Sequence, residues 1–188
     1  MSGPAEVEVK SRSELRAWLA ANHTQTESIW LIHYKKQSPH YLPWPALVRE
    51  LLCWGWIDGQ AKRIDAERIK HRISPRRQGS HWSRINKGYV PELEAAGLMT
   101  DAGRAAVARA KADGSWDFLD DIEALVVPDD LQAALDADTG AADTWAAYPA
   151  GEKKQALFHL KSARRPATRA RRLAKIVANA AAGERTFT

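Results

Sequence analysis

The chain has 188 residues, a formal net charge of +5 and a hydrophobic content of 45%. This length and content suffice for a buried core, and they predict one domain, or one domain with a helical extension. A single cysteine, Cys53, excludes an internal disulfide framework and a metal site built from several thiolates. Because Cys53 lies in an apolar run, we expect a buried and unreactive thiol.

The start of the chain lacks the basic, apolar and small-residue segments that make up a signal peptide. No apolar run reaches the 18 residues that are needed to cross a bilayer. The sequence therefore predicts a cytoplasmic protein without a membrane span.

Charge is unevenly distributed along the chain. Residues 49–90 hold ten Lys/Arg against four Asp/Glu, and residues 113–143 hold ten Asp/Glu and no Lys/Arg. Residues 152–175 are basic again, with nine Lys/Arg and one acidic residue. Either the acidic segment neutralises the basic ones within the fold, or a basic surface meets an anionic partner.

The first 55 residues alternate strand and helix patterns. Residues 6–10 alternate charged and β-branched side chains, and residues 28–35 are rich in aromatic and β-branched ones, as strands are. Ser11 to Glu14 has the spacing of a capping box and predicts a helix. Residues 43–45 open a second helix, which ends at Gly55.

The stretch Leu52–Lys87 concentrates polar and aromatic side chains, with three of the eight tryptophans among closely spaced arginines. The triplet at 57–59 is a turn signal. Residues 61–64 and 68–74 then alternate polar and apolar side chains around the turn-like residues 65–67. We predict an antiparallel strand pair with its isoleucines on the core side.

The remainder of the chain is typical of helices. A helix capped by Ser80 or Ser83 ends near Gly97, and Pro91 interrupts or restarts it. Thr100 caps another helix, and everything beyond residue 116 has a helical pattern.

The predicted fold class is α+β, with a small antiparallel sheet packed with helices in the N-terminal half and an all-helical C-terminal half. We expect an α+β domain over residues 1–115. A helical region over residues 116–188 is expected to pack on it as one globular unit.

Several long strings in this sequence are similar to one bacterial family. CWGWIDG, SPRR, HWSRINK, GLMT and KSARRPATRARRLAKIVANAAAGER resemble the YdeI/OmdA family, which is labelled bacteriocin-protection, YdeI or OmpD-associated. The resemblance runs from about Ile29 to Arg185. It implies a role in resistance to antimicrobial peptides or related compounds, and it implies no particular reaction, cofactor or catalytic residue.

Two adjacent arginines begin the candidate site. Arg76 and Arg77 follow Pro75, which keeps the preceding backbone extended. Neighbouring side chains on an extended chain point to opposite sides, so one arginine can pack inward while the other faces a ligand. The helix start after Ser80 attracts phosphate or carboxylate, and guanidinium groups bind either of them bidentately.

The other candidates each have a structural alternative. Asp58 can accept hydrogen bonds from backbone amides of its turn. It can also form an ion pair with Arg76 or Arg77, a role that Asp65 could fill as well. The functional alternative is that Asp58 orients a substrate amine. Trp56 and Trp82 either pack in the core or line the cleft. The predicted site for a small-molecule or peptide ligand, of anionic character, comprises Trp56, Asp58, Gln60, Arg72, Arg76, Arg77, Ser80, Trp82 and Asn86.

The sequence predicts no metal site and no cofactor. Its six histidines lack the spacing of a zinc motif, and no nucleotide-binding loop or nucleophile motif occurs. His33 and His71 could approach one another on strands, although surface or core placement is favoured. An enzyme is the alternative function, with Asp58 as the base and Arg72 or Arg76 stabilising developing negative charge.

The last helix carries a basic stripe. Arg165, Arg169 and Arg172 lie at positions i, i+4 and i+7. The stripe is either solvated, paired with the acidic segment 113–143, or a contact surface for nucleic acid, which is the second alternative partner.

Overall fold

A four-stranded sheet, in the order β1-β2-β4-β3, organises the first half of the chain in the computed structural model, which describes residues 4–184. β2 (Ile29–Tyr34), β4 (Arg68–Pro75) and β3 (Trp56–Arg63) pair in antiparallel fashion, as predicted. β1 (Glu6–Glu8) is parallel to β2, because helix α1 (Arg12–Asn22) carries the chain across between them. The α+β class is confirmed, and the sheet is mixed instead of purely antiparallel.

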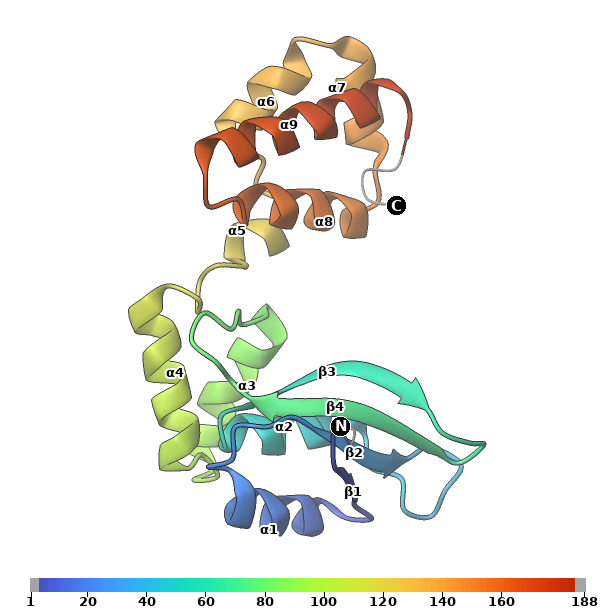
Figure 1. Cartoon of the computed structure of the whole chain (residues 1–188), viewed down its shortest axis with the longest axis vertical. Helices are drawn as coiled ribbons and strands as arrows, with labels where there is room; N and C mark the ends of the chain where they lie inside the picture. Colours follow the sequence, from blue (N-terminus) through green and yellow to red (C-terminus); the bar gives the residue numbers. More distant parts are fainter. Residues whose placement is uncertain (1–3, 185–188) are drawn as a thin grey trace. The chain divides into compact units, whose positions relative to one another are not determined.

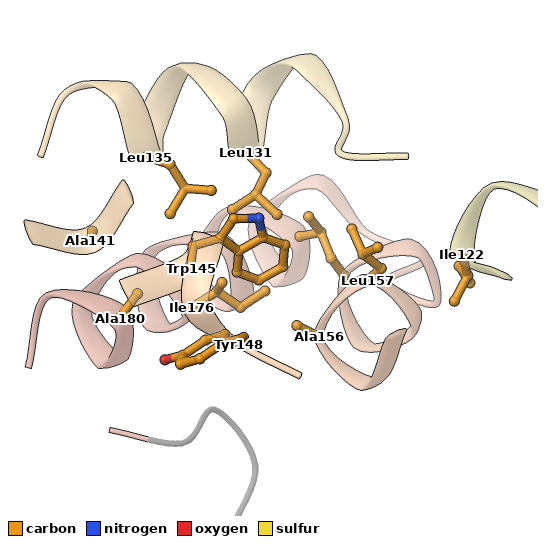
Figure 2. Packing of buried hydrophobic residues seen from close by; sticks show 11 residues of the cluster. Ile122, Leu131, Leu135, Ala141, Trp145, Tyr148, Ala156, Leu157, Ile176 and Ala180 are labelled. Atoms are coloured by element: carbon orange, nitrogen blue, oxygen red, sulfur yellow. The ribbon is translucent and has the colours of Figure 1, made fainter. Parts of the chain in front are cut away.

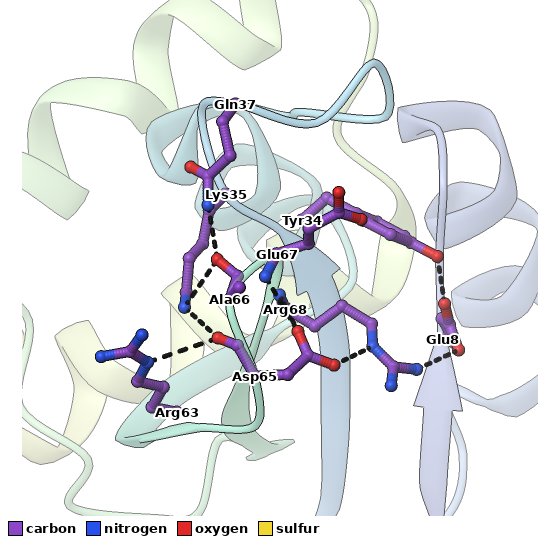
Figure 3. A network of polar contacts seen from close by, with 9 residues as sticks. All are labelled: Glu8, Tyr34, Lys35, Gln37, Arg63, Asp65, Ala66, Glu67 and Arg68. Carbon is purple, nitrogen blue, oxygen red and sulfur yellow. Dashed lines mark hydrogen bonds and ion pairs between the residues drawn. The ribbon is translucent and has the colours of Figure 1, made fainter.

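The β3–β4 hairpin turns where the sequence predicts it. One carboxylate oxygen of Asp65 accepts hydrogen bonds from the backbone N–H groups of Glu67 (2.9 Å) and Arg68 (2.7 Å). The other carboxylate oxygen accepts one from the Arg68 guanidinium at 2.8 Å, as Figure 3 shows. Asp65 is therefore fully used in holding its own turn.

The predicted turn at 57–59 is wrong. These residues lie inside β3, where the register with β4 shifts between Asp58 and Ala61. Ladder pairing with β4 outweighs the local turn preference of this Asp-Gly pair. An irregularity of this kind re-aims a strand side chain, and here it falls beside Asp58.

Helices α1 and α2 (Trp44–Cys53) lie on one face of the sheet (Figure 1). Their apolar sides meet the sheet in a shared core. Its buried members are Val9, Leu15, Leu19, Ile29, Leu31, Leu47, Leu51, Trp56 and Ile73.

A buried carboxylate connects α1 to α2. The Glu50 side chain is 1% exposed and pairs with both Arg12 and Arg16, the latter at 2.9 Å. Arg16 also donates a hydrogen bond to the Leu98 carbonyl at 3.1 Å. The negative charge is thus neutralised by two guanidinium groups, as a buried ion requires.

Helix α3 (Arg84–Ala95) and helix α4 (Asp101–Asp113) complete this part of the fold. Thr100 caps α4, as predicted, and of the two predicted alternatives for α3 it is Ser83, not Ser80, that caps the helix. Pro91 lies within α3 without interrupting it. The buried neighbours of this proline in the helix offset the one lost backbone hydrogen bond.

Helices α2 and α4 approach at backbone distance. The Thr100 hydroxyl donates a hydrogen bond to the Cys53 carbonyl at 2.6 Å, and a Cβ atom placed on Gly103 would lie 2.4 Å from the same oxygen. Only glycine fits this crossing. The Cys53 thiol is buried, as predicted, and burial raises its pKa.

Two histidines pair beneath α2. His33 Nε2 on β2 and His71 Nδ1 on β4 lie 2.9 Å apart, close enough to share one proton. The Trp44 ring stacks on His71 with centroids 3.7 Å apart. Burial, together with the charge of His71, lowers the pKa of His33 to about 4, so this buried ring is neutral.

The chain divides into two compact units, Met1–Asp117 and Phe118–Thr188. The helices of the second unit are α5 (Asp120–Glu123), α6 (Asp129–Asp136), α7 (Thr139–Ala147), α8 (Ala150–Lys161) and α9 (Pro166–Ala181). Figure 2 shows their separate apolar core, with the ring of Trp145 at its centre. The core residues are Ile122, Leu131, Leu135, Ala141, Trp145, Tyr148, Ala156, Leu157, Leu160, Ile176 and Ala180.

Residues 4–184 lack two features. No helix there is long and apolar enough to cross a membrane. No group of three or more His, Cys, Asp or Glu side chains there is placed to hold a metal ion.

The α2–α4 crossing generates a stability prediction. Gly103→Ala should lower the free energy of unfolding by about 1–3 kcal/mol, because the new methyl group meets a backbone carbonyl. Gly88→Ala is the matched control. Gly88 lies in the middle of α3, and a Cβ atom placed on it would have no neighbour within 4 Å. We expect it to be neutral or to add up to about 1 kcal/mol. Denaturant titration measures both, and equal effects of the two variants would contradict this account.

The histidine pair generates a pH prediction. The unfolded chain takes up a proton on His33 near pH 6.5, whereas the folded chain does so only near pH 4. Stability should therefore fall as the pH drops from about 6.5 to 4. His33→Phe should show a shallower fall than the wild type in thermal melts across this range. His40→Phe, at an exposed position, should retain the wild-type slope.

Candidate functional site

Two hollows in the first unit meet at Asp58. The polar hollow has a volume of about 290 Å³ and lies at the end of the β3–β4 pair. Its polar lining comes from Ser28, Asp58, Arg72, Ser74, Arg77 and Ser80. The aromatic hollow has a volume of about 330 Å³ and lies between β3, the start of α2 and the start of α3. Its lining is Trp44, Pro45, Val48, Asp58, Ser83, Ile85, Asn86 and Tyr89.

The Asp58 carboxylate has no internal partner. It makes no hydrogen bond and no ion pair with any residue in the described range 4–184. Asp58 is half-buried on β3. Burial lowers the pKa values of His71 and Arg76, and the negative charge of Asp58 opposes that lowering. Of the alternatives that the sequence leaves open, the structure shows neither the turn hydrogen bonds nor the ion pair for this residue.

Arg76 lies behind the site wall. Its side chain is only 5% exposed, and its guanidinium carbon lies 3.7 Å from the centre of the Trp82 ring. One nitrogen donates to the His81 carbonyl at 3.2 Å, while Nε and Nη2 have no partner. Burial lowers the pKa of Arg76 to about 10, which Asp58 partly opposes, so this arginine stays charged at neutral pH.

Arg72 and Arg77 are exposed and line the polar hollow. Arg72 Nε donates to the Ser28 hydroxyl at 2.9 Å, and the backbone N–H of Arg77 donates to the Ser80 hydroxyl at 3.2 Å. Within the described part of the chain, neither guanidinium pairs with a carboxylate. Both arginines therefore contribute positive charge to the lining of the hollow without an ion pair of their own.

The structure separates the nine predicted site residues. It brings Asp58, Arg72, Arg77 and Ser80 to the polar hollow, and Asp58 and Asn86 to the aromatic hollow. The remaining four lie elsewhere. Trp56 and Trp82, 0% and 1% exposed, are core residues, and Arg76 is buried. Gln60 is exposed, lies within the register shift between Asp58 and Ala61, and lines neither hollow.

Sequence reasoning did not include Trp44, Tyr89 or Ser28 in the site. The run at 43–45 is a helix start, and Trp44 lies outside the buried stripe of that helix, which begins at Leu47. A large aromatic residue outside the buried stripe of its helix must contact something else, so its position in the sequence can indicate a site residue.

The basic stripe of α9 is largely engaged within the second unit. Arg169 makes two hydrogen bonds of 2.8 Å to the Asp130 carboxylate, which belongs to the acidic segment 113–143. Arg172 donates to the Ser162 hydroxyl at 3.1 Å, and Arg165 is exposed just before the helix. For Arg169, pairing with the acidic segment is the arrangement found.

Comparison with family models divides the chain in two. Residues 7–106 match a domain of unknown function, DUF8412, and residues 124–183 match the family described as bacteriocin-protection, YdeI or OmpD-associated. Neither the curated proteins nor the solved structures contained a match to this chain. The second match supports the YdeI/OmdA resemblance, over a shorter span than the motifs indicated. The chain therefore belongs to the DUF8412 family through its first unit and carries a YdeI/OmdA region in its second.

Proposed function

We propose that this protein binds a small anionic molecule or a short peptide in the polar hollow of its first unit. The observation that supports this most is the state of the charges there. Among residues 4–184, Arg72 and Arg77 have no carboxylate partner, and the Asp58 carboxylate makes no hydrogen bond or ion pair. Charged groups left without partners in one concave surface are arranged for a ligand.

The chemistry of these groups defines the ligand class. Guanidinium groups bind carboxylate or phosphate through two parallel hydrogen bonds. A carboxylate such as Asp58 accepts hydrogen bonds from an amine or amide. A peptide end or an amino acid presents both kinds of group and would satisfy both sides of the hollow.

The family description of the second unit supports a role in protection against bacteriocins or other antimicrobial compounds. Capture of such a compound, or of a fragment of it, is the form of protection that a binding site can provide. A cytoplasmic location remains a prediction.

An enzymatic role is the second candidate, because Asp58 keeps a carboxylate without hydrogen bonds beside Arg72. In that case Asp58 is the base and Arg72 stabilises negative charge that develops on the substrate. Nucleic-acid binding through α9 has less support, since Arg169 is already paired.

Binding in the polar hollow can be tested with simple anions. Trialanine, its C-terminal amide and inorganic phosphate are titrated against the wild type and the double variant Arg72→Gln/Arg77→Gln. We expect the free carboxylate or the phosphate to bind the wild type, and the double variant to bind at least about tenfold more weakly, because charged hydrogen bonds are lost. Isothermal titration calorimetry measures the affinities.

Lys36→Gln/Arg63→Gln is the control, since it removes the same charge at exposed positions outside both hollows. Equal losses in the two double variants would show only a general charge effect. The proposal fails if no carboxylate or phosphate binds the wild type.

Protection can be tested in cells. A sensitive bacterial host that expresses the wild type should survive a panel of bacteriocins better than the same host expressing Arg72→Gln/Arg77→Gln at an equal level. Survival counts on plates measure the difference, and equal survival would separate the hollow from any protective role.

A further inference from the structure

Trp44 presents a fixed aromatic surface to the aromatic hollow. One side of its ring stacks on His71, with centroids 3.7 Å apart and planes inclined by 18°. His33 lies in the same stack, 5.0 Å from Trp44. These contacts and its packing against both apolar clusters of the unit hold the indole, and the half-buried ring contributes to the lining of the hollow. A flat ligand ring can stack there without first ordering the tryptophan.

Two polar side chains with unused capacity line the same hollow. The Asp58 carboxylate offers two acceptor oxygens that make no hydrogen bond with any side chain or backbone group of the described residues, 4–184. Asn86 uses its backbone N–H to bond the Ser83 hydroxyl at 3.2 Å, while its side-chain amide makes no hydrogen bond with residues 4–184. An acceptor pair and an amide beside a stacking surface match the hydrogen-bonding edge of a heterocycle.

The charges around Asp58 favour a neutral ring over a cation. The carboxylate already acts on the buried Arg76 guanidinium and on His71. A cationic ligand would be repelled by the charge of Arg76, which is buried behind the wall, and by Arg72 and Arg77 of the adjoining polar hollow. An anionic ring would face Asp58 itself. A neutral edge with N–H donors avoids both repulsions.

We infer that the aromatic hollow takes a flat nitrogen heterocycle with a ring N–H next to an exocyclic amine, as in guanine. The ring stacks on Trp44, and both donors reach the two oxygens of Asp58. The volume of about 330 Å³ is that of a small-ligand site. This inference rests on the proposed function, because Asp58 also lines the polar hollow, where Arg72 and Arg77 hold the anionic group of the same ligand.

Guanosine, inosine and guanosine 5′-monophosphate test the inference by calorimetric titration of the full chain. Inosine keeps the ring N–H and lacks the exocyclic amine. The wild type should bind guanosine about tenfold more tightly than inosine, because one hydrogen bond to a carboxylate is lost. Asp58→Asn should abolish this difference, since an amide cannot accept from both donors. Asp129→Asn, an exposed position in the second unit, should retain it.

Trp44→Leu should weaken guanosine and inosine alike. Because Trp44 also packs on the histidine pair, thermal melting establishes whether this variant is folded. Asp58→Asn removes no hydrogen bond or ion pair within the described part of the chain, so the test does not depend on the tryptophan variant.

The nucleotide separates the two proposals. Tighter binding of the monophosphate than of guanosine, lost in Arg72→Gln/Arg77→Gln, supports both hollows. If guanosine binds and the monophosphate binds no more tightly, the result supports the ring site and contradicts the proposal that the polar hollow holds the anionic group. Absence of guanosine binding, or equal binding of guanosine and inosine, overturns the ring site even if trialanine or phosphate binds.

Discussion

The backbone contact between α2 and α4 is the constraint on which the first unit depends. At Cys53 the carbonyl of α2 accepts a hydrogen bond from Thr100 and lies against Gly103, so the two helices are as close as backbones allow. This contact fixes the C-terminal end of α2. The same helix contributes to both apolar clusters of the unit and carries Trp44 at its other end. The position of the aromatic hollow follows from the placement of this one helix.

Buried polar groups are satisfied unevenly across the first unit. Glu50 has two arginine partners, as a buried charge requires. Other buried nitrogens among residues 4–184 have no hydrogen-bond partner, namely one each on His33, Trp54 and Trp56 and two on Arg76. Native proteins satisfy nearly all of their buried polar groups. Of these exceptions, the two on Arg76 belong to a charged side chain whose only hydrogen bond within the described residues goes to the His81 carbonyl.

The two family matches follow the two compact units. The domain of unknown function lies within the first unit, which contains both hollows, and the bacteriocin-protection match lies within the second. The protective label and the candidate site thus belong to different parts of the chain. A fold or family name does not carry a mechanism, so the function of the first unit has to be argued from its side chains.

Local chemistry along the sequence determined much of this protein. The caps at Ser83 and Thr100 and the turn held by Asp65 depend on hydrogen bonds within about three residues, so their patterns are visible in the chain itself. Only the tertiary structure decided features that need partners far apart in sequence. These are the parallel pairing of β1, the strand position of Asp58 and the stack of His71 on Trp44. The physical reason is that a ladder or a packed ring gains its energy from non-local contacts, which override a local preference and leave no periodic trace in the sequence.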